Sequence, residues 1–206
     1  MPLPVPKKSA EEKFSELEER SFDFQIEKRD DETGELIGHA AIFNKYTDIL
    51  WWKERIIPGA FKESIKSDDI RALFNHDPNY VLGRNKAGTL KLEEDEKGLA
   101  VRIKPPDTQI ANDVVKLIER GDVSQMSFAF QVLEDAWVYG EEKDPDKRDL
   151  LKVKLWDVSP VVYPAYKGTD IAVRSYENWK KLHTQPETAW RRNLLRRYFN
   201  IKIKGG

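Results

Sequence analysis

The chain has 206 residues, of which 39% are hydrophobic and 34% charged, and its formal net charge is −1. This length suits one domain with terminal segments or two small domains, and the near-neutral charge argues against a molecule that is polybasic as a whole. Cysteine is absent, which excludes disulfides, thiol nucleophiles and cysteine-based zinc sites.

The first 20 residues are rich in proline and then in lysine and glutamate, which predicts a flexible lead-in with at most a short polar helix. They contain no apolar run of signal-peptide length, and no stretch of the chain approaches the length of a membrane span. Residues 22–26 alternate apolar and polar side chains as a strand does, and residues 36–43 predict its partner in a hairpin.

The middle of the chain predicts short elements bounded by turn residues. Residues 60–67 favour a short helix after Pro58 and Gly59, and residues 70–74 favour a strand. Residues 89–93 and 99–104 predict a second hairpin.

The clearest helix covers residues 108–120, because its apolar residues recur at helical spacing, two prolines precede it and Gly121 follows it. Residues 123–134 and 150–162 predict two long strands joined by a charged loop or hairpin tip at 139–149. Several strands with one strong interior helix favour a mainly β (α+β) domain, a closed β-barrel surrounded by helices.

Beyond Pro164 the sequence predicts a short strand at 171–174 and helices at 177–183 and 187–199. Residues 190–204 carry six basic side chains and no acidic one, so this tail suits either an acidic partner or a solvated terminal helix. We therefore expect a lead-in at 1–20, a folded domain at 21–175 and a basic helical tail at 176–206.

Of the three histidines, His76 is the best placed to act as a general base. Extending the alternation of the preceding strand puts it on the face of Ile70, Ala72 and Phe74, at the rim of an apolar surface. The competing interpretation is a structural or turn histidine, since Asn-His-Asp-Pro is also good turn sequence.

Ser127 is a small hydroxyl residue within an apolar strand. Alternation puts Met126 and Phe128 on one face and Ser127 on the other, and a strand is a rigid mount for a nucleophile. No G-x-S-x-G motif marks this serine, so an ordinary strand serine stays open.

Asp157 ends an apolar stripe formed by Leu151, Val153 and Leu155. A carboxylate there is costly to bury without a partner, and an imidazole is a suitable one. An exposed aspartate held by turn hydrogen bonds before Ser159 and Pro160 is the alternative.

Taken in order, several short motifs resemble the prohead proteases of tailed phages, across about residues 22–175. The matching segments are Gly38-His39-Ala40-Ala41-Ile42-Phe43, Ile57-Pro58-Gly59-Ala60-Phe61, Ala72-Leu73-Phe74-Asn75-His76-Asp77, Val81-Leu82-Gly83-Arg84, Gly88-Thr89-Leu90 with Leu92, Glu96-Lys97-Gly98-Leu99, the run from Gly121 to Phe130, Trp156-Asp157-Val158-Ser159-Pro160-Val161 and Pro164-Ala165-Tyr166. Each motif is weak alone, and their joint order and spacing are specific.

This resemblance implies a serine endopeptidase with a fold similar to herpesvirus assemblin. It assigns the catalytic serine and histidine to Ser127 and His76. The third member, often glutamate in the family, falls on Asp157, whose side chain is shorter and reaches less far. Arg84 and Arg174 are candidate donors to the oxyanion, beside backbone amides.

The resemblance also implies that the substrate is scaffold protein or the scaffolding segment of the major capsid protein, with cleavage of the protease itself. It places the enzyme in the host cytoplasm, inside the immature prohead, with a homodimer or oligomer as a possible state. We expect no cofactor, no metal and no membrane contact.

Three other functions compete with this interpretation. A non-enzymatic capsid assembly or scaffold protein would keep the fold, although loss of Ser127 or His76 would then be expected. Nucleic-acid binding through the basic tail conflicts with the neutral overall charge. Metal-dependent hydrolysis is disfavoured because the chain has no H-E-x-x-H motif and its three histidines are scattered.

Overall fold

A computed structural model of the chain describes residues 17–22, 28–29, 34–49, 52–138, 140 and 144–163. These residues belong to the first of the two units into which the chain divides, residues 1–167. The second unit, 168–206, lies outside the described residues, and so do the elements predicted at 171–174, 177–183 and 187–199, together with Arg174. The expected boundaries of lead-in, folded domain and tail stay predictions.

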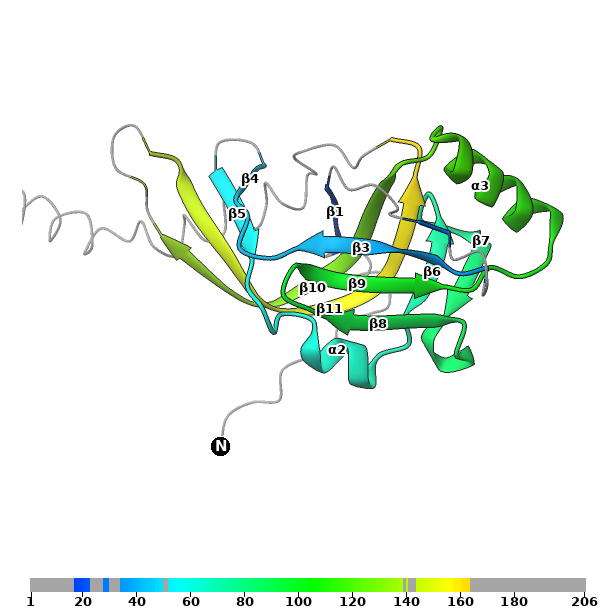
Figure 1. Ribbon diagram of the computed structural model, residues 1–206. Helices are drawn as coiled ribbons and strands as arrows, with labels where there is room; N and C mark the ends of the chain where they lie inside the picture. The colour runs from blue at the N-terminus through cyan, green and yellow to red at the C-terminus, as the bar shows by residue number, and fades with distance from the viewer. Residues whose placement is uncertain are drawn as a thin grey trace, which may run out of the picture. The chain divides into compact units, whose positions relative to one another are not determined.

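The described residues form a mainly β fold with short helices (Figure 1). Its strands are β1 (Glu18–Phe22), β2 (Lys28–Arg29), β3 (Leu36–Ile42), β4 (Thr47–Asp48), β5 (Trp52–Ile56), β6 (Arg71–Phe74), β7 (Asp77–Arg84), β8 (Leu90–Glu94), β9 (Gly98–Ile103), β10 (Gln125–Val138) and β11 (Asp146–Val161). Its helices are α2 (Lys62–Ser67), α3 (Gln109–Arg120) and the 3-10 turn η1 (Asn85–Ala87).

The larger sheet is built around the long hairpin β10–β11. It has seven strands, in the order β1-β10-β11-β5-β4, with β6 added to β11 and β7 to β6. Along the same strand β11, the first part pairs in parallel with β5 and a later part pairs in parallel with β6. This arrangement brings the β6–β7 hairpin beside the part of β11 that carries Asp157.

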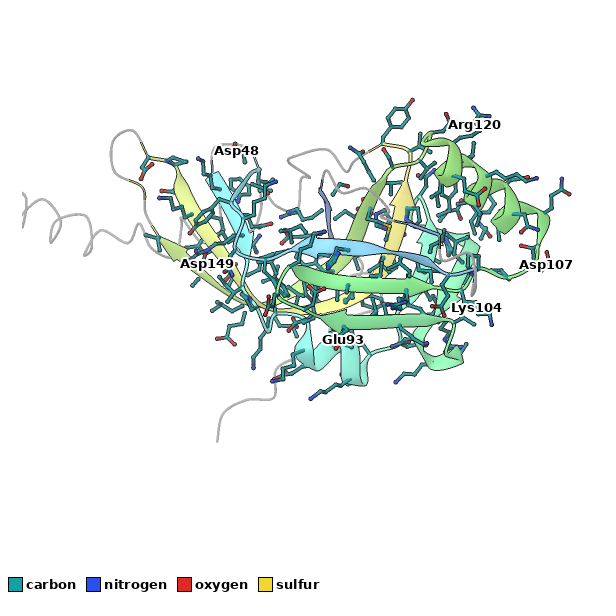
Figure 2. The ribbon with its side chains drawn as sticks, in the orientation of Figure 1. Asp48, Glu93, Lys104, Asp107, Arg120 and Asp149 are labelled. Atoms are coloured by element: carbon teal, nitrogen blue, oxygen red, sulfur yellow. The ribbon has the colours of Figure 1, made fainter. Side chains whose placement is uncertain are left out.

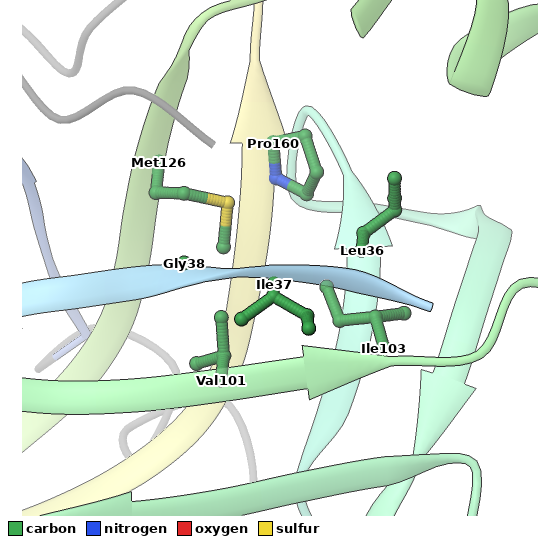
Figure 3. Close-up of a pocket in the computed structure, with 7 residues that line it drawn as sticks. All are labelled: Leu36, Ile37, Gly38, Val101, Ile103, Met126 and Pro160. Carbon is green, nitrogen blue, oxygen red and sulfur yellow. The ribbon is translucent and has the colours of Figure 1, made fainter. Parts of the chain in front are cut away.

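The second sheet has four strands in the order β2-β3-β9-β8, and β3 packs against β1 and β10 of the larger sheet. A narrow apolar crevice lies at this junction, where Leu36 and Val101 face Met126 and Pro160 (Figure 3). Met126 and Pro160 are cross-strand partners in β10 and β11, and both line the crevice. Met126 directly precedes Ser127, and Pro160 lies three residues after Asp157. The second sheet therefore supports the part of the hairpin that carries Ser127 and Asp157.

The mainly aliphatic core contains a cluster of packed aromatic rings. The ring of Phe128 meets that of Phe61 edge-on at 5.5 Å and stacks on Phe130 at 4.9 Å, and all three side chains are buried. Phe61 enters this core from the turn before α2. Each fully buried side chain of this kind stabilises the fold by about 1.5–3 kcal/mol, so β10 is held rigidly.

Helix α3 forms where its sequence signals predict. The Thr108 side chain accepts a hydrogen bond from the Ala111 amide at the first turn, and Gly121 ends the helix in the left-handed conformation. The side chains of Asp107 and Arg120 mark its two ends in Figure 2.

The expectation of a closed barrel needs correction. Among the described residues the two sheets share one isolated bridge, between Phe43 and Ile56, while β7 pairs only with β6 and β8 only with β9. Closure requires a continuous ladder around the whole barrel. Here η1 turns the chain at the corner between β7 and β8, and Thr89 bonds to Arg84 only at that corner.

Other predicted elements were found with shifted bounds. The helix expected at 60–67, the strand at 70–74 and the hairpin at 89–104 correspond to α2, β6 and β8–β9. The expected hairpin tip at 139–149 is shorter, because β10 continues to Val138 and β11 starts at Asp146. The strand expected at 22–26 lies, beyond Phe22, outside the described residues. Strand β1 starts at Glu18, inside the expected lead-in, and pairs with β10, whereas β2 pairs with β3.

Candidate active site

Ser127 lies on β10 between two neighbouring strands. Its backbone is opposite Ser21 of β1 on one side and Ser159 of β11 on the other. Met126 and Phe128 point into the apolar core, so Ser127 points to the opposite face, as the alternation predicts. The side chain is fully buried, with 0% exposure.

His76 lies in the tight turn between β6 and β7, where Phe74 pairs with Asp77. Asn75 and His76 both have positive φ, 55° and 59°, as the central residues of a type I′ hairpin turn do. The expected continuation of the strand face through His76 is therefore wrong, because His76 lies in the turn itself. The positive φ costs on the order of 1 kcal/mol at a histidine, which the surrounding contacts must offset.

Asn75 supplies such contacts. Its amide donates to the Pro160 carbonyl at 3.0 Å, and its Oδ1 accepts from the Val162 amide at 2.9 Å. Both partners belong to the end of β11 and the residue that follows it. Asn75 therefore fixes the histidine turn to the strand that carries Asp157.

The three side chains form one continuous hydrogen-bonded chain. His76 Nε2 lies 2.7 Å from Ser127 Oγ, and His76 Nδ1 lies 2.6 Å from Asp157 Oδ1. Asp157 is buried, at 8% exposure, which removes the alternative of an exposed turn aspartate. A hydroxyl, an imidazole and a carboxylate in this order are typical of serine hydrolases.

Ser159 is a fourth polar residue of this site. Its Oγ donates to the same Asp157 Oδ1 at 2.7 Å, and its side chain is fully buried. This second donor holds the carboxylate in place and satisfies part of its hydrogen-bonding capacity. The i, i+2 spacing that puts both residues on one face of β11 could have revealed it in the sequence.

The environment of His76 favours its protonated form. Burial alone lowers the pKa of His76, but the hydrogen bond to Asp157 and the negative charges of Asp157 and Glu19 outweigh it. The net pKa lies above the ordinary histidine value of 6.5. A carboxylate that stabilises the imidazolium is what a histidine base needs after it takes a proton.

Ser127 has a second hydrogen-bond partner in β1. Its Oγ donates to the backbone carbonyl of Arg20 at 3.0 Å. A hydroxyl has only one proton to donate. While Ser127 donates that proton to Arg20 O, its hydrogen bond with His76 requires that Nε2 carries a proton and donates it to Oγ. This state of the site is consistent with a doubly protonated His76.

The candidate oxyanion residue Arg84 is held by a carboxylate at the surface. Its Nε and Nη2 donate to Asp69 at 2.7 Å and 2.6 Å, and this side chain is 46% exposed. The other candidate, Arg174, lies outside the described residues. The role of either arginine stays a prediction.

His39 belongs to different surroundings. His39, on β3, bonds through Nε2 to Asp95 at 2.7 Å, and His183 lies outside the described residues. In the part of the chain that the structure describes, no group of three or more His, Cys, Asp or Glu side chains is arranged to hold a metal ion.

Comparisons with known proteins identify the family. A family model described as Caudovirus prohead serine protease matches residues 20–182, and the chain belongs to this family of serine peptidases of phage capsid maturation. The family and the enzyme class inferred from the sequence motifs are thereby confirmed.

Among solved structures, the chain is similar to the capsid assembly protease of bacteriophage T4, gp21, at 10% sequence identity and a TM-score of 0.48. That likeness covers 71% of this chain and 97% of the other. No curated protein sequence matches the chain. No helix within the described ranges is long and apolar enough to cross a membrane.

Proposed function

We propose that this chain is the serine endopeptidase that cleaves scaffold protein, or the scaffolding segment of the major capsid protein, during maturation of a phage prohead. It also cleaves itself, and it acts inside the immature prohead in the host cytoplasm. The observation that carries this proposal is the continuous hydrogen-bonded chain from Asp157 through His76 to Ser127. Membership of the prohead protease family supports the choice of substrate.

In this mechanism Ser127 is the nucleophile and His76 the general base. His76 Nε2 takes the hydroxyl proton as Oγ attacks the substrate carbonyl carbon, and it returns that proton to the leaving amine. Water then hydrolyses the acyl-enzyme, again with His76 as base. Asp157, 2.6 Å from Nδ1, holds the ring orientation and stabilises the imidazolium.

The tetrahedral oxyanion requires hydrogen-bond donors. Backbone amides, Arg84 and Arg174 are the candidates, and Arg84 must leave its bidentate contact with Asp69 to serve. Replacement of Arg84 by alanine therefore distinguishes a surface ion pair from an oxyanion donor. An unchanged kcat would remove Arg84 from the candidates.

The test uses the wild type, Ser127→Ala and the matched control Ser124→Ala, each incubated with the capsid and scaffold proteins of the same phage. Ser124 is an exposed serine three positions away that no step of the mechanism uses. We expect cleavage by the wild type and Ser124→Ala, and a loss of at least about 10³-fold in Ser127→Ala. Intact substrates in all three reactions would favour a non-enzymatic assembly protein of the same fold.

A further inference from the structure

Strand β1 covers the nucleophile. It pairs antiparallel with β10 so that Ser21 lies opposite Ser127 and Arg20 opposite Phe128. With β1 in place, Ser127 has no exposed surface, although a protease must bring its nucleophile to a peptide bond. An extended peptide that added to the edge of β10 would take the position that β1 fills.

The backbone group of β1 next to the nucleophile is the Arg20 carbonyl. Ser127 Oγ lies 3.0 Å from that carbonyl oxygen, and the peptide bond that follows it joins Arg20 to Ser21. The carbon that Ser127 would attack is bonded to this oxygen, so the hydrogen bond holds the Arg20 carbonyl group next to the nucleophile. Strand β1 thus places one specific bond of the chain beside its own serine.

The side chains of β1 occupy a buried charged socket, formed by Glu54 and Arg148. Arg20 donates to Glu54 at 2.7 Å and 3.1 Å, and Arg148 donates to Glu18 at 3.1 Å. All four groups are almost fully buried. Such a socket recognises a basic side chain at the residue whose carbonyl faces Ser127.

We propose that β1 is docked as a substrate: Glu54 recognises the Arg20 side chain, and the protease cleaves its own Arg20–Ser21 bond within the same molecule. The proposal rests on the proposed function, since it uses the same nucleophile and base. It names the bond and the side chain at which self-cleavage occurs.

The reaction starts when neutral His76 replaces Arg20 O as the acceptor of the Ser127 proton. Ser127 Oγ then bonds to the carbonyl carbon of Arg20, the bond from that carbon to the Ser21 nitrogen breaks, and His76 gives its proton to the departing amine. Water hydrolyses the ester between Arg20 and Ser127. The products are a peptide ending in the Arg20 carboxylate, a chain beginning at Ser21 and a free Ser127 hydroxyl.

The charges of the socket allow the product to leave. Departure of residues up to Arg20 removes one buried negative group, Glu18, and one buried positive group, Arg20, and leaves the opposite charges of Glu54 and Arg148 paired with each other. Arg148 keeps its contacts with Glu54 at 3.0 Å and with Asp135 at 2.7 Å. The family match starts at residue 20, so nearly all of the released peptide lies outside it.

The test measures intact mass and N-terminal sequence over time for the full-length wild type and for Ser127→Ala. We expect the wild type to yield a chain beginning at Ser21, at a rate that dilution leaves unchanged, and Ser127→Ala to stay whole. Arg20→Gln, which removes the cation held by Glu54, is expected to slow this cleavage at least about tenfold. Arg120→Gln is the matched control, an exposed arginine at the end of α3, and it should be cleaved like the wild type.

The outcomes separate this inference from the proposed function. A wild type that cleaves the capsid protein while its own residues 1–20 stay attached would overturn the inference and leave the function standing. First cleavage at another bond, or a rate that falls on dilution, would overturn it as well. If the wild type cleaves neither itself nor the capsid protein, both are overturned. Thermal melting of Arg20→Gln verifies that it folds, and Arg20→Lys, which keeps the cation, should retain cleavage.

Discussion

At the scale of single residues, the site depends on a histidine that a turn holds in place. His76 reaches Ser127 and Asp157 from the two-residue turn between β6 and β7, and its positive φ is maintained by contacts of its neighbour Asn75. Asp157 in turn accepts from both His76 and Ser159. Each of these dependences has a measurable consequence.

The first prediction concerns Asp157→Asn and the pH dependence of cleavage. The base works when neutral, so kcat/KM of the wild type should rise with pH through the pKa of His76, which lies above 6.5. Asp157→Asn removes one of the two negative charges that raise this pKa and leaves that of Glu19, while burial, which lowers the pKa, remains. We expect the rise of kcat/KM with pH to occur at lower pH in this variant, and kcat to fall by at least about 10²-fold.

Cleavage of a capsid-derived peptide between pH 5 and 9, about the range in which a histidine titrates, measures the pH at which kcat/KM rises. Asp113→Asn on α3, an exposed carboxylate, is the control and should keep the wild-type profile. If kcat/KM of Asp157→Asn rises at the same pH as that of the wild type, the assigned role of Asp157 is contradicted.

The second prediction concerns Asn75 as a positioning residue. Asn75→Ala loses the acceptor for the Val162 amide and puts an alanine at φ 55°, which together should cost about 1–3 kcal/mol of stability. The His76 ring would lose part of its fixed orientation, so kcat should fall more than KM rises. Asn75→Asp keeps an acceptor oxygen and should retain most of kcat; equal losses in both variants would argue against positioning.

Sequence alone predicted the face of one strand-borne residue correctly. The alternation in 126–130 puts Ser127 on the face opposite Met126 and Phe128, as the structure has it. The alternation in 151–157 put Asp157 on the face of Leu155, but a β-bulge between these two residues pairs Asp157 with Ala129 and turns it to the face of Ser127. The same argument misplaced His76, since a hairpin turn ends the alternation. The contact of Ser127 with Arg20 joins residues 107 positions apart and leaves no local signal.

At the scale of elements, β1 shows what residue patterns could not reveal. Glu18 and Arg20 belong to a charged segment that is typical of a solvated lead-in, yet both are buried. Arg20 meets Glu54 across 34 positions of the chain, and Glu18 meets Arg148 across 130. Buried charges are acceptable only with such partners, and the partners become visible only in the folded chain.

The third prediction concerns the pairing of β3 with β9 at Gly98. A Cβ added to Gly98 would lie 1.9 Å from the backbone oxygen of Ala41, and backbone of a paired strand cannot move aside cheaply. We expect Gly98→Ala to lower the free energy of unfolding by about 3 kcal/mol or more. Urea denaturation monitored by tryptophan fluorescence measures it.

Gly88→Ala is the matched control for this prediction. Gly88 has φ +72°, and nothing lies within 4 Å of an added Cβ, so only backbone strain of about 1 kcal/mol is expected. Equal losses in the two variants would show that close approach of β3 and β9 is not what requires glycine at position 98.

At the scale of the whole molecule, the two sheets act together through the aromatic cluster of the core beneath β10. Phe128 lies next to Ser127, contacts the rings of Phe61 and Phe130 and is completely buried. The rigidity of the strand that carries Ser127 and the stability of the domain therefore depend on the same packing. A closed ladder is not needed for this, since the rings fill the space between the sheets.

The fourth prediction follows from this shared packing. Phe128→Ala should lower the free energy of unfolding by about 3–5 kcal/mol, because it removes a fully buried ring and leaves a cavity between the two sheets. Leu133→Ala on the same strand is the control: that side chain is 60% exposed, and its loss should stay within about 0.5 kcal/mol. Urea denaturation followed in parallel by circular dichroism and tryptophan fluorescence should give one coincident transition for both variants. Separate transitions in Phe128→Ala would mean that the two sheets unfold independently, and the core would then not be the link between them.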